Sequence, residues 1–300
     1  MRCIIAILTK TAKFVFSKNY RGSVDNKSCL WYTMCNRTMF RSEDSRKHAT
    51  SFRSDKNQKN IEKDAFVFSK ANGRTMHKIM EEMQAIRVRT TLENLRRNNF
   101  EAVYVPNARD ALTTLKSYLT PGCTIGVGGS VTLDEIGAID LFRSGDYNFL
   151  DRYAPNLTPD ELKNIMRRAM TSDVFVMSTN AVTENGELYN VDGRSNRVAP
   201  LLFGPDSVVV VAGINKIVAD IDEAVHRHKT VAAPANSARL RCNNPCVRTG
   251  KCVSLMRQTD EEMCAGCASE DRICANYVIS ARQREAGRIK VILVGETLGF

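Results

Sequence analysis

Hydrophobic and polar residues alternate with two different periods along most of this chain. From Met76 onward apolar residues recur near helical spacing, which predicts a helix over 76–98. Its apolar face comprises Ile79, Met83, Ile86, Val88, Leu92 and Leu95. Further helices are predicted over 108–119, from about 131, over 159–170 and over 218–228. Short apolar runs predict strands over 102–105, 124–127, 173–178, 187–191, 208–212 and 289–294.

Because these strands and helices take turns, the sequence predicts an α/β fold with a mostly parallel sheet covered by helices. The valine run 208–211 is typical of a strand that is buried on both faces. Sheets of this kind bind ligands at the carboxyl ends of their strands. The informative loops are therefore expected after Val127, Ser178, Val191 and Ala212.

The first quarter of the chain has a different composition. Residues 1–75 hold 16 of the 43 basic residues and 6 of the 33 acidic ones, so they carry the whole net charge of +10. They show no sustained period, which predicts a disordered basic N-terminal extension; a basic arm that contacts a partner is the alternative. The remainder is electrically neutral, so nucleic acid is not an expected partner. No apolar run approaches the length of a membrane span, and a cytoplasmic protein is expected.

A glycine-rich loop follows the strand predicted over 124–127. Gly128, Gly129 and Ser130 precede a helix start, where Thr132 and Glu135 stand at the spacing of a capping box. Glycines let the backbone approach a ligand, and free amides at a helix start attract anions. The loop is thus either a cradle for an anionic ligand or a tight turn needed only for packing.

A second group of polar residues follows the strand over 173–178. Asn185-Gly186 predicts a hairpin turn. Loops within a short reach of it carry Asn180, Thr183, Glu184, Asp192, Asn196, Arg197, Asn215 and Lys216. A carboxylate beside cations and amides suits acid/base or nucleophilic catalysis, and it equally suits hydrogen bonding to a ligand.

Cysteines supply the third candidate site. Six of the ten lie between residues 242 and 274: Cys242, Cys246, Cys252, Cys264, Cys267 and Cys274. Four thiolates suffice for a [4Fe–4S] cluster or a structural zinc ion. The spacing matches neither a zinc ribbon nor the ferredoxin run. Outside this segment, Cys123 is expected to be a core thiol, and His226 and His228 are expected to be surface residues.

Several ordered motifs over about residues 77–300 resemble the lactate-utilisation (LUD) domain family. They are Gly128–Gly137, Thr179–Leu188, Val191–Gly193 with Asn196–Val198, Phe203–Pro205 and Gly213–Val218. The resemblance implies a Rossmann-like fold related to CoA transferases and ribose-5-phosphate isomerases. It also implies a role in lactate utilisation beside other subunits of a lactate-oxidation system, with a small anionic metabolite as ligand.

The cysteine segment resembles the C-terminal extension of some stand-alone LUD proteins. That resemblance implies an iron–sulfur cluster, with zinc as the alternative, held by Cys246, Cys252, Cys267 and Cys274. Residues 253–265 look like an insertion, which leaves Cys264 as a possible substitute for Cys267.

A shorter resemblance concerns Glu184-Asn185-Gly186, which is similar to the Glu-Asn-Gly of CoA transferases. It implies covalent catalysis by Glu184. The sequence thus leaves three hypotheses for the function: a redox accessory protein of lactate oxidation, an acyl- or CoA-transfer enzyme, and a non-catalytic scaffold.

Overall fold

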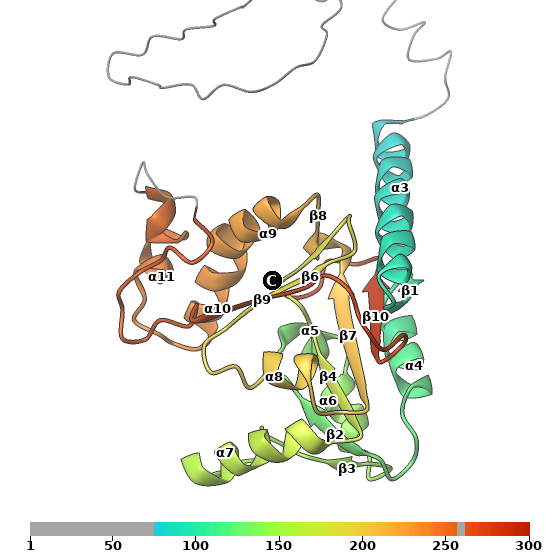
Figure 1. The fold of residues 1–300 in the computed structure, drawn as a ribbon, viewed down its shortest axis with the longest axis vertical. Coiled ribbons are helices and arrows are strands. Elements are labelled where there is room, and N and C mark those ends of the chain that lie inside the picture. Colours follow the sequence, from blue (N-terminus) through green and yellow to red (C-terminus); the bar gives the residue numbers. More distant parts are fainter. Residues whose placement is uncertain (1–74, 257–261) are drawn as a thin grey trace, which may run out of the picture. The chain divides into compact units, whose positions relative to one another are not determined.

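A computed structural model describes residues 75–256 and 262–300. The N-terminal extension expected over residues 1–75 therefore lies almost entirely outside the described residues, as do Cys3, Cys29 and Cys35. Figure 1 shows the described part of the chain as a ribbon.

The centre of the fold is a six-stranded sheet in which every strand pairing is parallel. In spatial order its strands are β1 (Glu101–Val105), β10 (Ile289–Val294), β7 (Ser207–Gly213), β4 (Val174–Met177), β2 (Thr124–Val127) and β3 (Asn148–Phe149). The predicted α/β class and its mostly parallel Rossmann-like sheet are confirmed. The last strand along the chain, β10, lies between β1 and β7 and so completes the sheet after the cysteine segment.

Alternating residues of β7 explain why both faces of this sheet are covered. Val208 and Val210 point into a core shared with the helix α3 (Met76–Arg97). Val209 and Val211 point into the opposite core. That second core includes side chains of α4 (Ala108–Ser117), α5 (Val131–Glu135) and α6 (Ala138–Phe142). The run of valines is fully buried because successive side chains supply two different cores.

A second, four-stranded sheet lies beyond the carboxyl ends of β4 and β7. Its order is β8 (Ile217–Val218), β5 (Ala181–Thr183), β6 (Leu188–Asp192) and β9 (Asn276–Ser280). The predicted hairpin is present, since β5 and β6 pair antiparallel and Gly186 adopts φ +81°. Strand β9 has no counterpart in the sequence prediction, because its residues alternate too weakly to mark an element.

The remaining helices surround this second sheet and the sheet ends. They are α7 (Pro159–Arg168), α8 (Val198–Leu202), α9 (Ile221–Arg227), a π-helical turn (His228–Ala232), α10 (Ala233–Arg239) and α11 (Pro245–Thr249). The helix predicted over 218–228 begins later, because residues 217–218 pair with β5 and the Asp220 side chain caps α9. The capping box expected at Thr132 and Glu135 is also wrong: Ser130 caps α5 by accepting from the backbone N–H of Leu133.

The apolar face predicted for α3 is only half buried. Val88, Leu92 and Leu95 pack into the core, whereas Ile79 and Met83 are exposed within the described residues. Only the C-terminal half of the helix lies alongside β1 (Figure 1). A search of the described helices found none with the length and apolar character of a membrane span.

Replacing Leu293 in β10 by alanine should lower the free energy of unfolding by about 2–5 kcal/mol. The side chain is fully buried in the core that α3 shares with the sheet, so its loss leaves a cavity there. Urea denaturation measures the change. The matched control is Leu202→Ala, whose side chain is 57% exposed, and a similar loss in both variants would contradict this description of the core.

Candidate functional site

Two cavities adjoin at the carboxyl ends of the main strands. The larger, called here the large cavity, has a volume of about 680 Å3. Its walls include the residues that directly follow β2, β4 and β7: Gly129 and Ser130, Ser178 to Asn180, and Lys216. The smaller, called the cysteine pocket, has a volume of about 20 Å3. His228, Ala233, Arg272 and Ile273 line both, so the two cavities share a wall.

Most residues proposed from sequence as ligand contacts line the large cavity. These are Gly129, Ser130, Asn180, Asp192, Asn196, Arg197 and Lys216. Gly128, Asn215 and Glu184 do not. The expectation that polar loops gather at one sheet edge therefore describes seven of these ten positions.

Arg197 holds this wall together. Its guanidinium donates to the backbone oxygens of Ser178 and Val191 and to the side-chain oxygens of Asn180 and Asn190. Its Nε lies 3.6 Å from a carboxylate oxygen of Asp192, and both side chains are only 12% exposed. Because its donors are directed to protein atoms, Arg197 fixes the loops after β4 and β6 and is not available as a ligand contact.

Gly128 and Asn215 support the cavity from behind its wall. A Cβ atom at Gly128 would lie 2.7 Å from Cγ of Arg197, so this glycine makes room for the arginine. Asn215 binds the chain end through the backbone N–H of Leu298 and the carbonyl of Gly299. Neither residue lines the wall of the large cavity.

Glu184 lies apart from both cavities, on the loop after β5. One carboxylate oxygen accepts from Nε of Arg87 at 2.7 Å, and the carbonyl of Glu184 accepts from the Asn94 side chain. These contacts join the hairpin to α3. The nearby Thr183 donates its hydroxyl to Glu187.

Lys216 is the most deeply buried charged group of the large cavity, at 2% exposure. Its Nζ donates to Oγ1 of Thr132 and to Oγ of Ser178, each at 2.9 Å. Burial lowers the pKa of Lys216 to about 7; the positive charges of Arg227 and Arg197 act in the same direction and Glu135 opposes them. A large share of this amine is thus neutral at physiological pH.

Basic side chains outnumber acidic ones on the wall of the large cavity. Burial lowers the pKa of Arg152 below its usual value; Tyr153 and Asp192 oppose this shift, and the nearby charges of Arg239 and Arg194 add to it. All three arginines line the cavity. Like charges held this close favour the entry of an anion.

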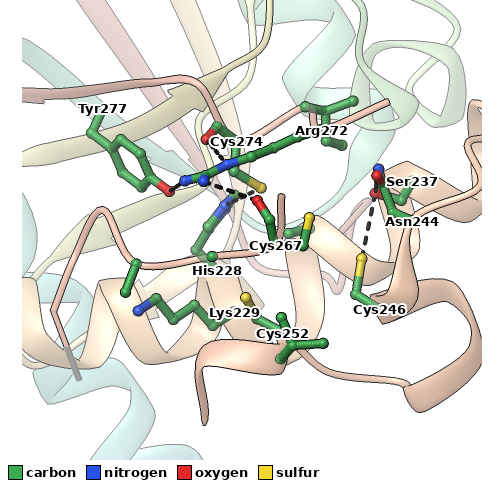
Figure 2. Close-up of a pocket in the computed structure, with 15 residues that line it drawn as sticks. His228, Lys229, Ser237, Asn244, Cys246, Cys252, Cys267, Arg272, Cys274 and Tyr277 are labelled. Carbon is green, nitrogen blue, oxygen red and sulfur yellow. Dashed lines mark hydrogen bonds between the residues drawn. The ribbon is translucent and has the colours of Figure 1, made fainter. Parts of the chain in front are cut away.

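The cysteine pocket collects the four proposed ligands from four places in the chain (Figure 2). Cys246 lies on α11, Cys252 follows it, Cys267 lies in the next loop and Cys274 directly precedes β9. Cys264 is exposed and absent from the pocket wall, and Cys242 lines the large cavity instead. Cys123 packs against the core beside β2, as expected.

His228 also lines this pocket, although the sequence places it on the surface. His226 is exposed as expected, but His228 is 5% exposed and its Nε2 lies 3.3 Å from Sγ of Cys274. His228 lies one turn after the buried Ala224 and Val225 and so shares their face of the helix, a face that the sequence prediction does not assign to the core. Burial, with the charges of Arg197, Lys229 and Arg227, lowers the pKa of His228 to about 3, so the ring is neutral.

The thiols of the pocket influence one another electrostatically. Burial, together with the neighbouring Cys252, Cys246 and Cys267, raises the pKa of Cys274 to about 12, against the effect of Arg272. Arg272 also fixes the loop, since its guanidinium donates to the backbone oxygens of Cys264, Cys267 and Cys274 (Figure 2 shows part of this network). A metal centre would offset the repulsion between thiolates and allow them to ionise together.

The donor set fits an iron–sulfur cluster or zinc in its chemistry, since four thiols line one pocket. Across residues 75–256 and 262–300, however, no three Cys, His, Asp or Glu side chains stand close enough to hold a single ion. Binding therefore requires the thiols to turn inward from the walls that they already occupy. Cys246 and Cys252 now bond with the hydroxyls of Ser237 and Ser254, contacts that rotation would release.

A model of the LUD domain matches residues 88–294, which include the main sheet, the second sheet and both cavities. This chain belongs to the LUD-domain family. It is accordingly a protein related to lactate utilisation. A DUF162 family protein from Deinococcus radiodurans is similar in structure, with 16% identity, a TM-score of 0.38, and coverage of 70% of this chain and 98% of that one. A search of curated proteins returned no match.

The substitution Lys216→Met removes the buried amine of this LUD domain. It should flatten the dependence of the free energy of unfolding on pH. The folded-state pKa of about 7 lies below the ordinary 10.5, so between these values the unfolded chain binds the extra proton. The free energy of unfolding of the wild type should therefore gain a contribution from Lys216 as pH rises from 7 to 10. Urea titrations across this range measure it. The exposed Lys163→Met should keep the wild-type slope, and an unchanged slope in Lys216→Met would refute the assignment.

Proposed function

We propose that this LUD-domain protein is a redox accessory component of lactate oxidation that carries an iron–sulfur cluster, of the [4Fe–4S] type. The ligands are Cys246, Cys252, Cys267 and Cys274. The observation that carries this proposal is that these four thiols, and not Cys264, line one pocket that shares a wall with the large basic cavity. The resemblance of the cysteine segment to the C-terminal extension of some stand-alone LUD proteins favours the cluster over zinc.

When bound, such a cluster supplies one-electron transfer. The residues of this chain set its surroundings. His228 places a neutral ring nitrogen against Cys274, and Arg272 fixes three backbone oxygens of the loop that carries Cys267. Hydrogen bonds to ligand sulfurs and burial are the means by which proteins tune such centres.

The large cavity is proposed to bind a small anionic metabolite. Arg152 and Arg239 lie on its wall, and a Cβ atom at Gly129 would stand 3.9 Å from Nη2 of Arg239. A carboxylate beside Gly129 would thus meet a guanidinium, which is a strong partner for it. Because His228 and Arg272 line both cavities, an anion bound here lies close to the proposed cluster. Other subunits of a lactate-oxidation system are the proposed electron partners.

Each of four single substitutions by serine should lower the iron and sulfide bound per chain after anaerobic reconstitution and should reduce the visible absorbance. The substituted residues are Cys246, Cys252, Cys267 and Cys274. Serine is a poor ligand in place of a thiolate. Cys264→Ser is the matched control, since it changes a neighbouring cysteine outside the pocket wall. Iron, sulfide and zinc analysis with electron paramagnetic resonance reads the outcome. Zinc without sulfide would remove the redox proposal, and loss of iron on Cys264→Ser alone would correct the ligand set.

Lactate or pyruvate should bind the full chain, and Arg152→Met or Arg239→Met should weaken that binding about tenfold, as expected for a lost hydrogen bond to a charged group. Isothermal titration calorimetry measures the dissociation constants. Arg167→Met, an exposed arginine of α7 that does not line the cavity, is the control. Equal affinities for all variants would argue against this cavity as the anion site.

A further inference from the structure

Three hydrogen-bonding side chains from separate elements meet on the wall of the large cavity. Ser178 follows β4, Lys216 lies in the short turn after β7, and Thr132 lies in α5. The Nζ atom of Lys216 stands 2.9 Å from Oγ of Ser178 and 2.9 Å from Oγ1 of Thr132. All three residues line the cavity, so a ligand can reach them.

The hydroxyls in this group have different roles. Thr132 Oγ1 donates to the carbonyl of Leu298 at 3.4 Å, so it accepts from Lys216. Within the described part of the chain, the Ser178 hydroxyl forms a hydrogen bond only with Nζ of Lys216. When the amine is neutral, its lone pair is therefore the natural acceptor for the Ser178 proton. Thr132 orients the amine in the way that a third group orients the base in a catalytic triad.

The charges around Lys216 suit a neutral amine. No Asp or Glu oxygen of the described residues lies within 4.0 Å of Nζ. Arg197 from before α8 and Arg227 from α9 repel a proton there, and Glu135 of α5 alone opposes them. A lysine desolvated beside other cations is an established kind of base or nucleophile.

We propose that Ser178 and Lys216 form a nucleophile–base pair that acts on the acyl carbon of an anionic ester or thioester, with Thr132 as a positioning residue. The Ser178 proton moves to Nζ as the Oγ–carbon bond forms. The bond from carbon to the leaving alcohol or thiol then breaks, and Nζ returns the proton to that group. Water hydrolyses the acyl-enzyme by the reverse sequence and restores both residues.

The substrate class follows from the cavity that holds the pair. Its arginines, Arg152 and Arg239, favour a carboxylate or phosphate on the substrate. A volume of about 680 Å3 exceeds the need of a three-carbon acid and suits a larger acyl carrier. This activity requires no cluster, so it stands or falls separately from the proposed redox function.

The chain contains a second Ser–Lys contact that serves as an internal control. Nζ of Lys290 lies 3.1 Å from Oγ of Ser207, at the opposite ends of strands β10 and β7 from the cavity. There a carboxylate oxygen of Glu101 lies 3.9 Å from Nζ, and neither residue lines a described cavity. That pair should be chemically silent.

A fluorophosphonate probe with the full chain tests the proposal. Ser178 Oγ should attack phosphorus and release fluoride, and mass spectrometry should find the label on Ser178 and not on Ser207. Lys216→Met should slow labelling at least 100-fold, the usual contribution of a general base. Thr132→Val should also slow it, with recovery in Thr132→Ser. In the unmodified protein, which needs no variant to fold, labelling should rise about tenfold from pH 6 to pH 8.

Other outcomes would overturn the pair. Labelling of Ser178 no faster than that of Ser207, or a pH-independent rate, would show that the serine is not activated. Borohydride trapping of pyruvate on Lys216 without labelling of Ser178 would make the lysine itself the nucleophile. Ser207→Ala and Lys290→Met should leave the Ser178 labelling rate unchanged.

Discussion

Both cavities depend on the hydrogen bonds and the positive charge of the Arg197 guanidinium. It binds backbone oxygens of Ser178 and Val191, and these belong to the ends of strands in two different sheets. A buried arginine is costly unless its donors are satisfied, and here four oxygens and Asp192 satisfy them. The same charge then acts at a distance on two titratable groups, since it lowers the pKa of both Lys216 and His228. One buried cation thus shapes the electrostatics of the amine in one cavity and the imidazole in the other.

Much of the main sheet could be predicted from sequence because its signals are local. The strands 124–127 and 289–294 have the predicted bounds, since each is a short apolar run flanked by residues that stop it. The second sheet could be predicted only in part, as the strand over 187–191 and its hairpin turn. Its strand β9 pairs with β6 from more than 80 residues away, and only that pairing gives it a structure. Ile79 and Met83 show a different limit of the sequence. A helical period predicts an amphipathic face but does not show which residues cover that face, and these two side chains are exposed.

Candidate site residues divide in the same manner. Polar residues directly after predicted strands, such as Ser130, Asn180 and Lys216, do line the large cavity, because topology alone brings strand ends together. Tertiary packing decides where the other candidate residues lie. Asn215 adjoins Lys216 in sequence, but it turns to hold Leu298 and Gly299. His228 faces the thiols because it shares the buried face of Ala224 and Val225, and Arg272 reaches the cysteine loop from a segment with no periodic signal.

The two cavities share a physical property that ties stability to function. Each gathers groups of one kind that influence one another electrostatically: arginines around the large cavity, partly offset by Asp192, and thiols around the cysteine pocket. A bound anion would relieve the first and a metal centre the second, and anything that binds only the folded state stabilises it. Since His228 and Arg272 contribute to both walls, a ligand in one cavity would contact residues that also line the other. If the proposed anion and the proposed cluster both bind, any coupling between the two sites must act equally in both directions.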